Sequence, residues 1–390
     1  MSAPAYGLET VRPRYGDASL ADIMPSVLAS LGVPDASDPL GLGAGPLADV
    51  RSVVVLLVDG LGYHLLPLAA PHAPTLAELL DAPGSRGITT GFPSTTPTSL
   101  ASLGTGAAPG AHGLVGFFLN VPGTDRVLNH IRWGHDDPDP LRWQPLATQF
   151  ARAEAAGIAA RVVSRPEFSG SGLTSAAFRG GVYIGATGAG NIAASVRQAV
   201  DSAPGSVVVY AYHPDVDRAG HEFGVDSLQW REAVAEVDRM VRMILEDLPP
   251  GGALVVTADH GQLNIPAEGR FDLDADPRLR AGIRVVAGEA RVRYLHTVDG
   301  ARADVLAAWR SVLGDAASVV TREEAVADGW FGPVPEEHLQ RIGDIVVICQ
   351  ADHVVLATKT DPATVERMVA FHGSATEAEM MIPLLLARRS

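Results

Sequence analysis

An apolar run that ends in an acidic residue places the strongest constraint on how this chain folds. Residues Ser52–Val58 are continuous aliphatic and β-branched side chains, which is typical of a strand buried on both faces at the centre of a parallel sheet. Asp59 follows directly, with Gly60 and Gly62 after it. Open α/β sheets bind ligands at the carboxyl ends of such strands, so Asp59 is either a site residue or a cap for the next helix.

Further apolar runs alternate with helical patterns along the chain. Strands are predicted at Ile158–Val163, Val207–Tyr212, Leu254–Thr257 and Ile382–Leu386. Helices are predicted at Leu20–Leu31 (kinked or restarted at Pro25), Thr75–Leu80, Leu146–Ala153, 188–203 and Leu228–Leu248. This alternation predicts an α/β fold with a large, mostly parallel central sheet and helices on both of its faces.

Residues 265–340 have a different character from the rest of the chain. They begin with a charged, loop-like stretch, followed by a predicted strand at Arg291–Val298 and a helix at Ala303–Leu313. We expect a small inserted α+β cap subdomain at 265–340, and a core made of 1–264 and 341–390. Ile345–Cys349 and Val354–Thr358 are predicted to form a hairpin within that core.

Composition excludes several classes of partner. The 390 residues carry a net charge of −15, which argues against a nucleic-acid polymer or an anionic membrane as the main partner. Cys349 is the only cysteine, so no internal disulfide is possible, and its apolar surroundings predict a buried side chain. No signal peptide or run long enough for a membrane span is evident, so we expect a cytoplasmic protein. The sequence does not indicate the oligomeric state.

Several metal-binding side chains come just after the predicted buried strands. Because parallel strands bring their carboxyl ends to one edge, we expect these groups to converge. Three carboxylates and three imidazoles suit a pair of Zn²⁺-like ions, which can together hold a phosphoryl group. Singly, each residue is also explained as a cap or as a buried histidine. The candidates are Asp59, Asp217, His221, Asp259, His260 and His372.

A threonine is the candidate nucleophile. Thr96 precedes Pro97 in GFPSTTPTSLASLGTG (91–106), and the pair predicts a helix that begins with Thr96 as its N-cap. A hydroxyl at a helix N-terminus lies where an anion is favoured, and a metal ion can lower the pKa of such a hydroxyl. Without the metal candidates, Thr96 would be only a cap.

Five motifs carry a resemblance to a known group of enzymes. VLLVDGLG, FPSTTPTSLASLGTG, DRAGHEFG, TADHG and FHGS resemble, in order, the metal and nucleophile motifs of the alkaline phosphatase superfamily, and within it the type I phosphodiesterase/nucleotide pyrophosphatase family. They span residues 51–387, nearly the whole chain. The resemblance implies an alkaline phosphatase-like fold and a phosphoric ester hydrolase that acts on a small phosphate ester or nucleotide-like substrate.

The resemblance also implies roles for individual residues. Asp217, His221 and His372 would hold one zinc ion, and Asp59, Asp259, His260 and Thr96 the other. Thr96 would form a covalent phosphothreonine that water later hydrolyses. Thr95 remains the alternative nucleophile. Asp215 competes with Asp217, although the family's spacing of Asp, three residues and His selects Asp217.

Two departures from the family leave the substrate open. The phosphate-binding asparagine expected after the His-Gly loop is replaced by Phe117, with Asn120 as the nearest substitute, and Pro97-Thr98-Ser99 replaces the usual Phe-Pro-Asn on the substrate side. A phosphomonoesterase, a phosphonate hydrolase and a non-catalytic metal or phosphate-binding module therefore remain alternatives.

The substrate-side residues favour a diester. No arginine lies between Gly87 and Thr124 to hold a terminal phosphate, although Arg165 or Arg218 could approach in space. Phe92, Phe117 and Phe118 are expected to pack against the second substituent of a diester. We therefore predict a phosphodiesterase.

Overall fold

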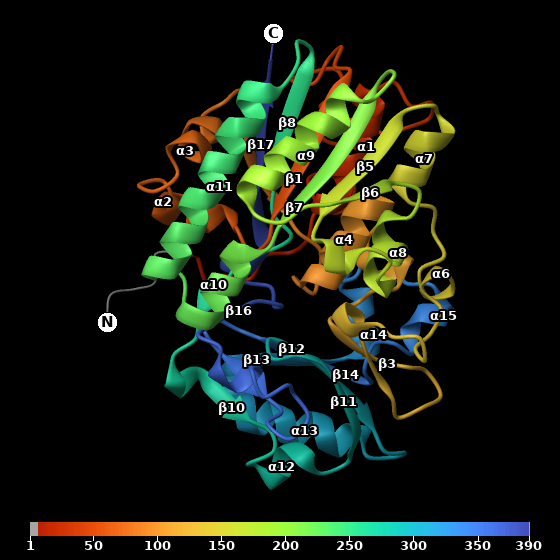
Figure 1. Cartoon of the computed structure of the whole chain (residues 1–390). Coiled ribbons are helices and arrows are strands. Elements are labelled where there is room, and N and C mark those ends of the chain that lie inside the picture. The colour runs from red at the N-terminus through yellow and green to blue at the C-terminus, as the bar shows by residue number, and fades with distance from the viewer. Residues whose placement is uncertain (1–6, 390) are drawn as a thin grey trace.

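A seven-stranded sheet forms the centre of the computed structural model, which describes residues 7–389 (Figure 1). The strands lie in the order β2-β17-β8-β1-β7-β5-β6. Their bounds are β1 Ser52–Val58, β2 Arg86–Thr89, β5 Ala159–Ser164, β6 Val182–Gly185, β7 Val207–His213, β8 Gly252–Thr257 and β17 Met381–Arg388. The predicted sheet and its central strand are confirmed.

The most apolar strands occupy the middle of this sheet. Every residue of β1, β7 and β8 is buried, and β1 pairs in parallel with both neighbours, with Leu57 opposite Tyr212 and Thr257. Strands β5 and β6 continue the parallel order, whereas β17 runs antiparallel to β8 and β2. The carboxyl ends of β8, β1 and β7 therefore lie side by side.

Helices cover both faces of the sheet, as predicted (Figure 1). One group holds α3 Pro74–Leu80, α9 Ala189–Asp201 and α11 Leu228–Asp247, and the other holds α1 Ile23–Ser30, α4 Thr96–Thr105, α7 Gln149–Ala155 and α8 Gly172–Phe178. The remaining helices of the core are short, apart from α10. They are α2 Leu66–Ala69, α5 Pro109–His112, α6 Pro140–Trp143, α10 Asp215–Phe223 and α16 Glu377–Met380.

A second, four-stranded antiparallel sheet lies below the large one in Figure 1, in the order β11-β12-β14-β13. Its strands are β11 Ile283–Glu289, β12 Val292–Thr297, β13 Ala317–Thr321 and β14 Ile345–Cys349, and its helices are α12 Pro277–Arg280, α13 Arg302–Leu313 and α14 Arg322–Ala327. The short helix α15 Glu336–Leu339 contacts α5 through His338. Three two-stranded sheets complete the chain: β3 Phe118–Asn120 with β4 Val127–Asn129, β9 Leu263–Asn264 with β16 Ala370–Phe371, and β10 Arg270–Asp272 with β15 Val354–Leu356.

The predicted hairpin of Ile345–Cys349 and Val354–Thr358 is wrong. Strand β14 pairs with β12 and β13, whereas β15 pairs in parallel with β10. The smaller sheet thus takes one strand from beyond residue 340. The division of the chain into a core and a cap at 265–340 stays a proposal. Cys349 is buried within β14, as expected.

Two helices begin at other positions than the sequence predicted. The N-cap of α4 is Thr95, so Thr96 is the first helical residue and the predicted cap is wrong by one position. Proline fits either of the first two helical positions, so Pro97 could not distinguish the two threonines. Near the N-terminus, a 3₁₀ turn at Leu20–Asp22 precedes α1, which places Pro25 in the first turn, where its missing N–H is not needed.

Among residues 7–389, no helix has the length and apolarity to span a membrane.

Candidate metal centre and nucleophile

The predicted site residues gather at the carboxyl edge of the central sheet. Asp59 follows β1, Asp259 and His260 follow β8, and Asp217 and His221 lie one turn apart on α10, which follows β7. His372 follows β16, which pairs with β9. The structure therefore brings all six candidate ligands together, in two groups of three.

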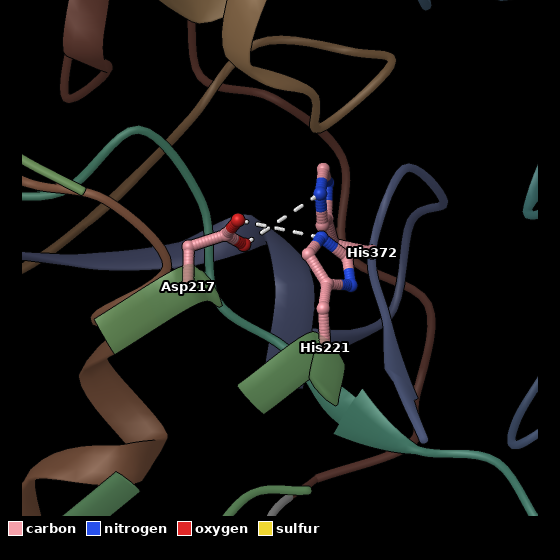
Figure 2. A group of neighbouring side chains, drawn as sticks. All are labelled: Asp217, His221 and His372. Carbon is pink, nitrogen blue, oxygen red and sulfur yellow. Dashed lines mark ion pairs between the residues drawn. The ribbon is translucent and has the colours of Figure 1, made fainter. Parts of the chain in front are cut away.

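The first group, the Asp217 cluster, consists of Asp217, His221 and His372. Nε2 of His221 lies 3.3 Å from Oδ2 of Asp217, and Nε2 of His372 lies 3.8 Å from Oδ1. Figure 2 shows the carboxylate directed toward both imidazole rings. One carboxylate and two imidazoles are a suitable donor set for a divalent ion such as zinc.

The second group, the Asp259 cluster, consists of Asp59, Asp259 and His260. Nε2 of His260 lies 3.5 Å from Oδ1 of Asp59 and 3.3 Å from Oδ2 of Asp259. The half-buried Thr96 joins this cluster, with its hydroxyl 3.3 Å from the same nitrogen. The rings of His260 and His372 stack with centroids 3.5 Å apart, so the two clusters adjoin.

All three imidazoles present Nε2 to the site because Nδ1 is used elsewhere. Nδ1 of His221 lies 2.8 Å from the carbonyl of Ala370, and Nδ1 of His372 lies 2.9 Å from that of Ser94. His260 makes the equivalent contact to Gly261 at 3.1 Å. A carbonyl only accepts, so each Nδ1 carries the proton and each Nε2 keeps its lone pair, as metal-binding histidines require.

Burial and charge act strongly on the acidic side chains. Burial, followed by the charges of Asp259 and Asp217, raises the pKa of Asp59 well above its ordinary value. Burial also raises the pKa of Asp259, which the neighbouring His260 opposes. Burial and the adjacent imidazoles lower the pKa of His372 far below its ordinary value. The fold thus buries these carboxylates and imidazoles together without supplying enough positive charge to balance the carboxylates.

Two carboxylate oxygens without hydrogen-bond partners indicate where a cation would stabilise the site. Oδ1 of Asp59 and Oδ2 of Asp259 are buried and have no hydrogen-bond partner among residues 7–389. Within each cluster, one donor atom per residue lies within 4.8 Å of the others. Buried, unpaired carboxylate oxygens are costly unless a cation approaches. The two oxygens belong to the Asp259 cluster, whose donor set therefore fits a divalent ion.

Two glycines allow the elements of the site to approach closely. Gly60 has a positive φ of 73°, and a Cβ there would lie 2.9 Å from Cβ of Asp217. Gly220 is inside α10, and a Cβ there would lie 1.8 Å from Oε1 of Gln262. Only glycine permits either approach, which explains its place in the Asp-Gly and Gly-His motifs.

The nucleophile loop is fixed to both clusters by hydrogen bonds. Ser99 on α4 donates to the carbonyl of Asp259 at 2.8 Å. Ser94 donates to the carbonyl of Ser374 at 2.6 Å and accepts from the N–H of Gly373 at 3.2 Å. The start of α4 is therefore held against the loops that carry Asp259 and His372.

Sequence reasoning missed three supporting side chains. Besides Ser94, the Tyr212 hydroxyl donates to Asp59, and the Gln262 amide donates to Asp217. A signal existed for two of them, because Tyr212 is a hydroxyl-bearing residue in an apolar strand and Gln262 directly follows Asp-His-Gly. Neither signal says which carboxylate is contacted.

Thr95 and Asp215, the alternatives to Thr96 and Asp217, do not face the candidate metal ligands. The Thr95 hydroxyl is fully buried and has no partner among the described residues, whereas the Thr96 hydroxyl faces His260. Asp215 pairs with Arg165 at 2.7 Å and belongs to neither cluster. The geometry therefore favours Thr96 and Asp217.

The substrate-side expectations are partly wrong. Phe92 is fully buried against Trp330 and Phe331, so it cannot contact a substrate. Pro97, Thr98 and Ser99 are also buried and form no substrate-facing wall.

Phe117 and Phe118 are the two aromatic residues of the Gly87–Thr124 segment that are not fully buried. They are half-buried and adjacent, with ring centroids 4.9 Å apart. Asn120 is buried in β3, and none of its hydrogen bonds among the described residues reaches either cluster.

Solved structures share this architecture. A murine ectonucleotide pyrophosphatase/phosphodiesterase 5 matches with a TM-score of 0.67 at 18% identity, over 85% of this chain and 87% of that one. An inactive threonine-to-alanine variant of it, in complex with AMP, matches with the same TM-score at 17% identity, over 86% and 87%. A phosphonoacetate hydrolase from Sinorhizobium meliloti, in complex with phosphonoacetate, also gives 0.67 at 18% identity, over 88% and 91%. At such identities the likeness concerns the fold, and no curated protein matched by sequence.

A mostly parallel sheet with two candidate metal clusters and a hydroxyl at its carboxyl edge defines an alkaline phosphatase-like hydrolase of phosphoesters. The family model for type I phosphodiesterase/nucleotide pyrophosphatase matches residues 53–375. The chain belongs to that family, whose members depend on metal ions, and the predicted resemblance is confirmed.

Proposed function

We propose that this protein is a two-metal phosphodiesterase of the nucleotide pyrophosphatase type, with Thr96 as a nucleophile that becomes transiently phosphorylated. The observation that carries the proposal is the Thr96 hydroxyl, which lies 3.3 Å from Nε2 of His260 and beside two adjoining clusters with free donor atoms. The inactive threonine variant of the murine neighbour supports a threonine nucleophile.

Each metal ion would have its own set of ligands. Asp217, His221 and His372 would hold one ion, and Asp59, Asp259, His260 and Thr96 the other. Two such ions supply positive charge to the phosphoryl oxygens and lower the pKa of a nearby hydroxyl. The hydrogen bonds of Ser94 and Ser99 hold Thr96 in place, and the free N–H groups at the start of α4 can donate to the phosphoryl oxygens. Zinc as the native ion and a cytoplasmic location stay predictions.

Apart from Arg218, the basic residues that could approach the site are engaged or distant, which favours a diester. Arg165 is engaged by Asp215 and, at 3.6 Å, by Glu167. Lys359 is the only lysine of the sequence, and it lies in the loop after β15, away from both clusters. A monoester brings more negative charge than a diester, and an uncompensated anion in a partly desolvated site is costly.

Aromatic side chains support the same choice. Glu289, the last residue of β11, packs against Gly373 beside His372, and β3, which begins with Phe118, lies against β11. Phe117 and Phe118 therefore border the site, where they can pack against an apolar or base-like substituent.

The test compares two substrates on one zinc-loaded preparation. We expect close to two ions per chain, and kcat/KM for a nucleotide-linked nitrophenyl diester at least about tenfold above that for nitrophenyl phosphate, or roughly 1.4 kcal/mol of transition-state preference. Chelation should abolish turnover and zinc should restore it. A preference for the monoester would overturn the diesterase, and turnover without metal would overturn the two-metal site.

A phosphonate hydrolase is the second candidate, because of one residue. Arg218 is exposed on α10 next to Asp217 and makes no ion pair among residues 7–389. A free cation at this position suits a carboxylate-bearing phosphonate, and the bacterial neighbour was solved with phosphonoacetate. Release of phosphate from phosphonoacetate that is lost in Arg218→Ala would favour this candidate over the diesterase.

A further inference from the structure

Each cluster contains one carboxylate that is held by a side chain outside the cluster. The Tyr212 hydroxyl donates to Oδ2 of Asp59, and the Gln262 amide donates to Oδ1 of Asp217. These two donors come from different elements, β7 and the loop after β8, and neither belongs to a candidate metal cluster. Asp259 needs no such donor, because its Oδ1 accepts the N–H groups of Gly60 and His260, each at 3.1 Å.

Tyr212 is fixed by the sheet. It lies on β7 opposite Leu57, two residues before Asp59, so the pleat places its ring on the face of the sheet to which Asp59 also points. The side chain is only 7% exposed, and the ring packs edge-on against Phe168 with centroids 6.2 Å apart. A carboxylate oxygen accepts hydrogen bonds, so the phenol hydroxyl is the donor in its contact with Asp59. With Oδ2 of Asp59 occupied, only Oδ1 is left to face His260.

Gln262 is fixed by a different contact. Its amide nitrogen also donates to the backbone carbonyl of Asp217 at 3.0 Å, and its amide oxygen packs over Gly220, where no Cβ is present. The side chain is fully buried. The amide therefore holds both the backbone and Oδ1 of Asp217. That oxygen also lies 3.8 Å from Nε2 of His372, whereas Oδ2 is held by no side-chain donor among the described residues and is directed to His221.

We propose that Tyr212 and Gln262 are positioning residues, one for each metal ion. Each occupies one oxygen of a ligand carboxylate and thereby fixes which oxygen is offered to the ion. This inference rests on the two-metal site proposed above. A carboxylate without its partner can rotate and must be ordered when the ion binds, so affinity falls. Loss of such an outer partner typically costs 10–100-fold in metal affinity.

Matched pairs of variants test the proposal. Tyr212→Phe removes the hydroxyl that contacts Asp59, and Tyr210→Phe removes one from the same strand that is buried without a partner among the described residues. Gln262→Met removes the amide at Asp217, and Gln149→Met removes a buried amide that donates instead to Thr105. All four proteins, and the unaltered one, are freed of metal and titrated with Co²⁺ against a competing chelator.

The readouts are the two affinities and the cobalt absorption bands. We expect Tyr212→Phe to weaken one ion by about 10–100-fold and to shift its bands, and Gln262→Met to do so for the other. The ion affected by Tyr212→Phe should be the one lost in Asp59→Asn, and the ion affected by Gln262→Met the one lost in His221→Ala. Both control variants should keep both affinities within about twofold.

Two outcomes would overturn the inference, and they differ in what else they overturn. Two bound ions whose affinities are unchanged in Tyr212→Phe and Gln262→Met, or equally weakened in all four variants, would remove the positioning roles alone. An unaltered protein that binds fewer than two ions would remove the proposed metal site together with them.

Discussion

At the scale of single residues, the site depends on hydrogen bonds that leave chosen atoms free. Each imidazole is oriented by a backbone carbonyl at Nδ1, and Asp59 and Asp217 are each held through one oxygen. Thr96 is held by its position at the start of α4, one residue after the N-cap. The Thr96 hydroxyl therefore makes no capping bond and is available for chemistry.

This geometry separates the roles of the two adjacent threonines. Thr96→Ala should lower turnover of the diester by at least about 10²–10³-fold, because it removes the nucleophile, while leaving both ions bound. Thr95→Ala should keep most of the activity and change stability little, because the Thr95 hydroxyl makes no capping hydrogen bond that the substitution could remove. Steady-state kinetics, metal analysis and denaturation of both variants make the comparison. A dead Thr95→Ala with an active Thr96→Ala would transfer the role to Thr95.

At the scale of elements, the tip of the β11–β12 hairpin joins the smaller sheet to the metal centre. Arg291, directly before β12, makes a bidentate pair with Glu379 at 2.6 and 2.9 Å, and both side chains are fully buried. Glu379 also accepts the N–H of Ser374 at 2.9 Å, two residues after His372. The smaller sheet thus supports the loop that carries one candidate ligand.

Replacing Arg291 should therefore affect both stability and metal binding. Arg291→Met leaves the buried Glu379 carboxylate uncompensated, and we expect a loss of about 3–5 kcal/mol in unfolding free energy, with weaker binding of the ion at His372. Arg302→Met, which removes a partly exposed ion pair with Glu323, should cost at most about 1 kcal/mol. Urea unfolding and metal titration provide the two readouts.

A double variant checks the physical reason for that loss. Adding Glu379→Gln to Arg291→Met removes the unpaired charge and should recover part of the stability. If the double variant is less stable than the single one, the loss comes from packing rather than from the buried charge.

At the scale of the whole molecule, buried neutral histidines link stability to pH. Burial lowers the pKa of His112 to about 3 and that of His130 to about 4. Both imidazoles are hydrogen-bonded inside the protein, His112 to Ser102 at 2.9 Å and His130 to Trp143 at 3.1 Å. Below pH 6.5 the unfolded chain binds protons that the folded protein does not. The stability these groups contribute is therefore complete above that pH and falls as the pH decreases.

His112→Asn should flatten this dependence. The unaltered protein should lose up to about 1.4 kcal/mol per pH unit for each such histidine between pH 6 and pH 4.5, and the variant should lose correspondingly less. His135→Asn, at a fully exposed position, should leave the slope unchanged. Urea unfolding with chelator in every sample excludes a contribution from metal release. Parallel curves for the unaltered protein and His112→Asn would contradict the prediction.

Local sequence patterns predicted individual strands better than they predicted which strands pair with one another. The fully apolar strands β1, β7 and β8 were recognisable because a strand buried on both faces requires such a run. The hairpin at 345–358 was wrong because an apolar run does not specify which strand it pairs with. The prediction that Phe92 contacts the substrate was wrong for a related reason, since an aromatic side chain suits a hydrophobic core and a substrate-binding surface equally.

The sequence by itself determined which residues reach the site. Asp59, Asp217, Asp259 and His260 follow buried strands, and neighbouring parallel strands end at a common edge, so their convergence followed from local pattern. The tertiary structure alone decided which atoms are free. The carbonyls at Nδ1 of His221 and His372, the Tyr212 hydroxyl and the Gln262 amide come from segments distant in the chain, and hydrogen bonds depend on distances of a few ångströms that only packing establishes.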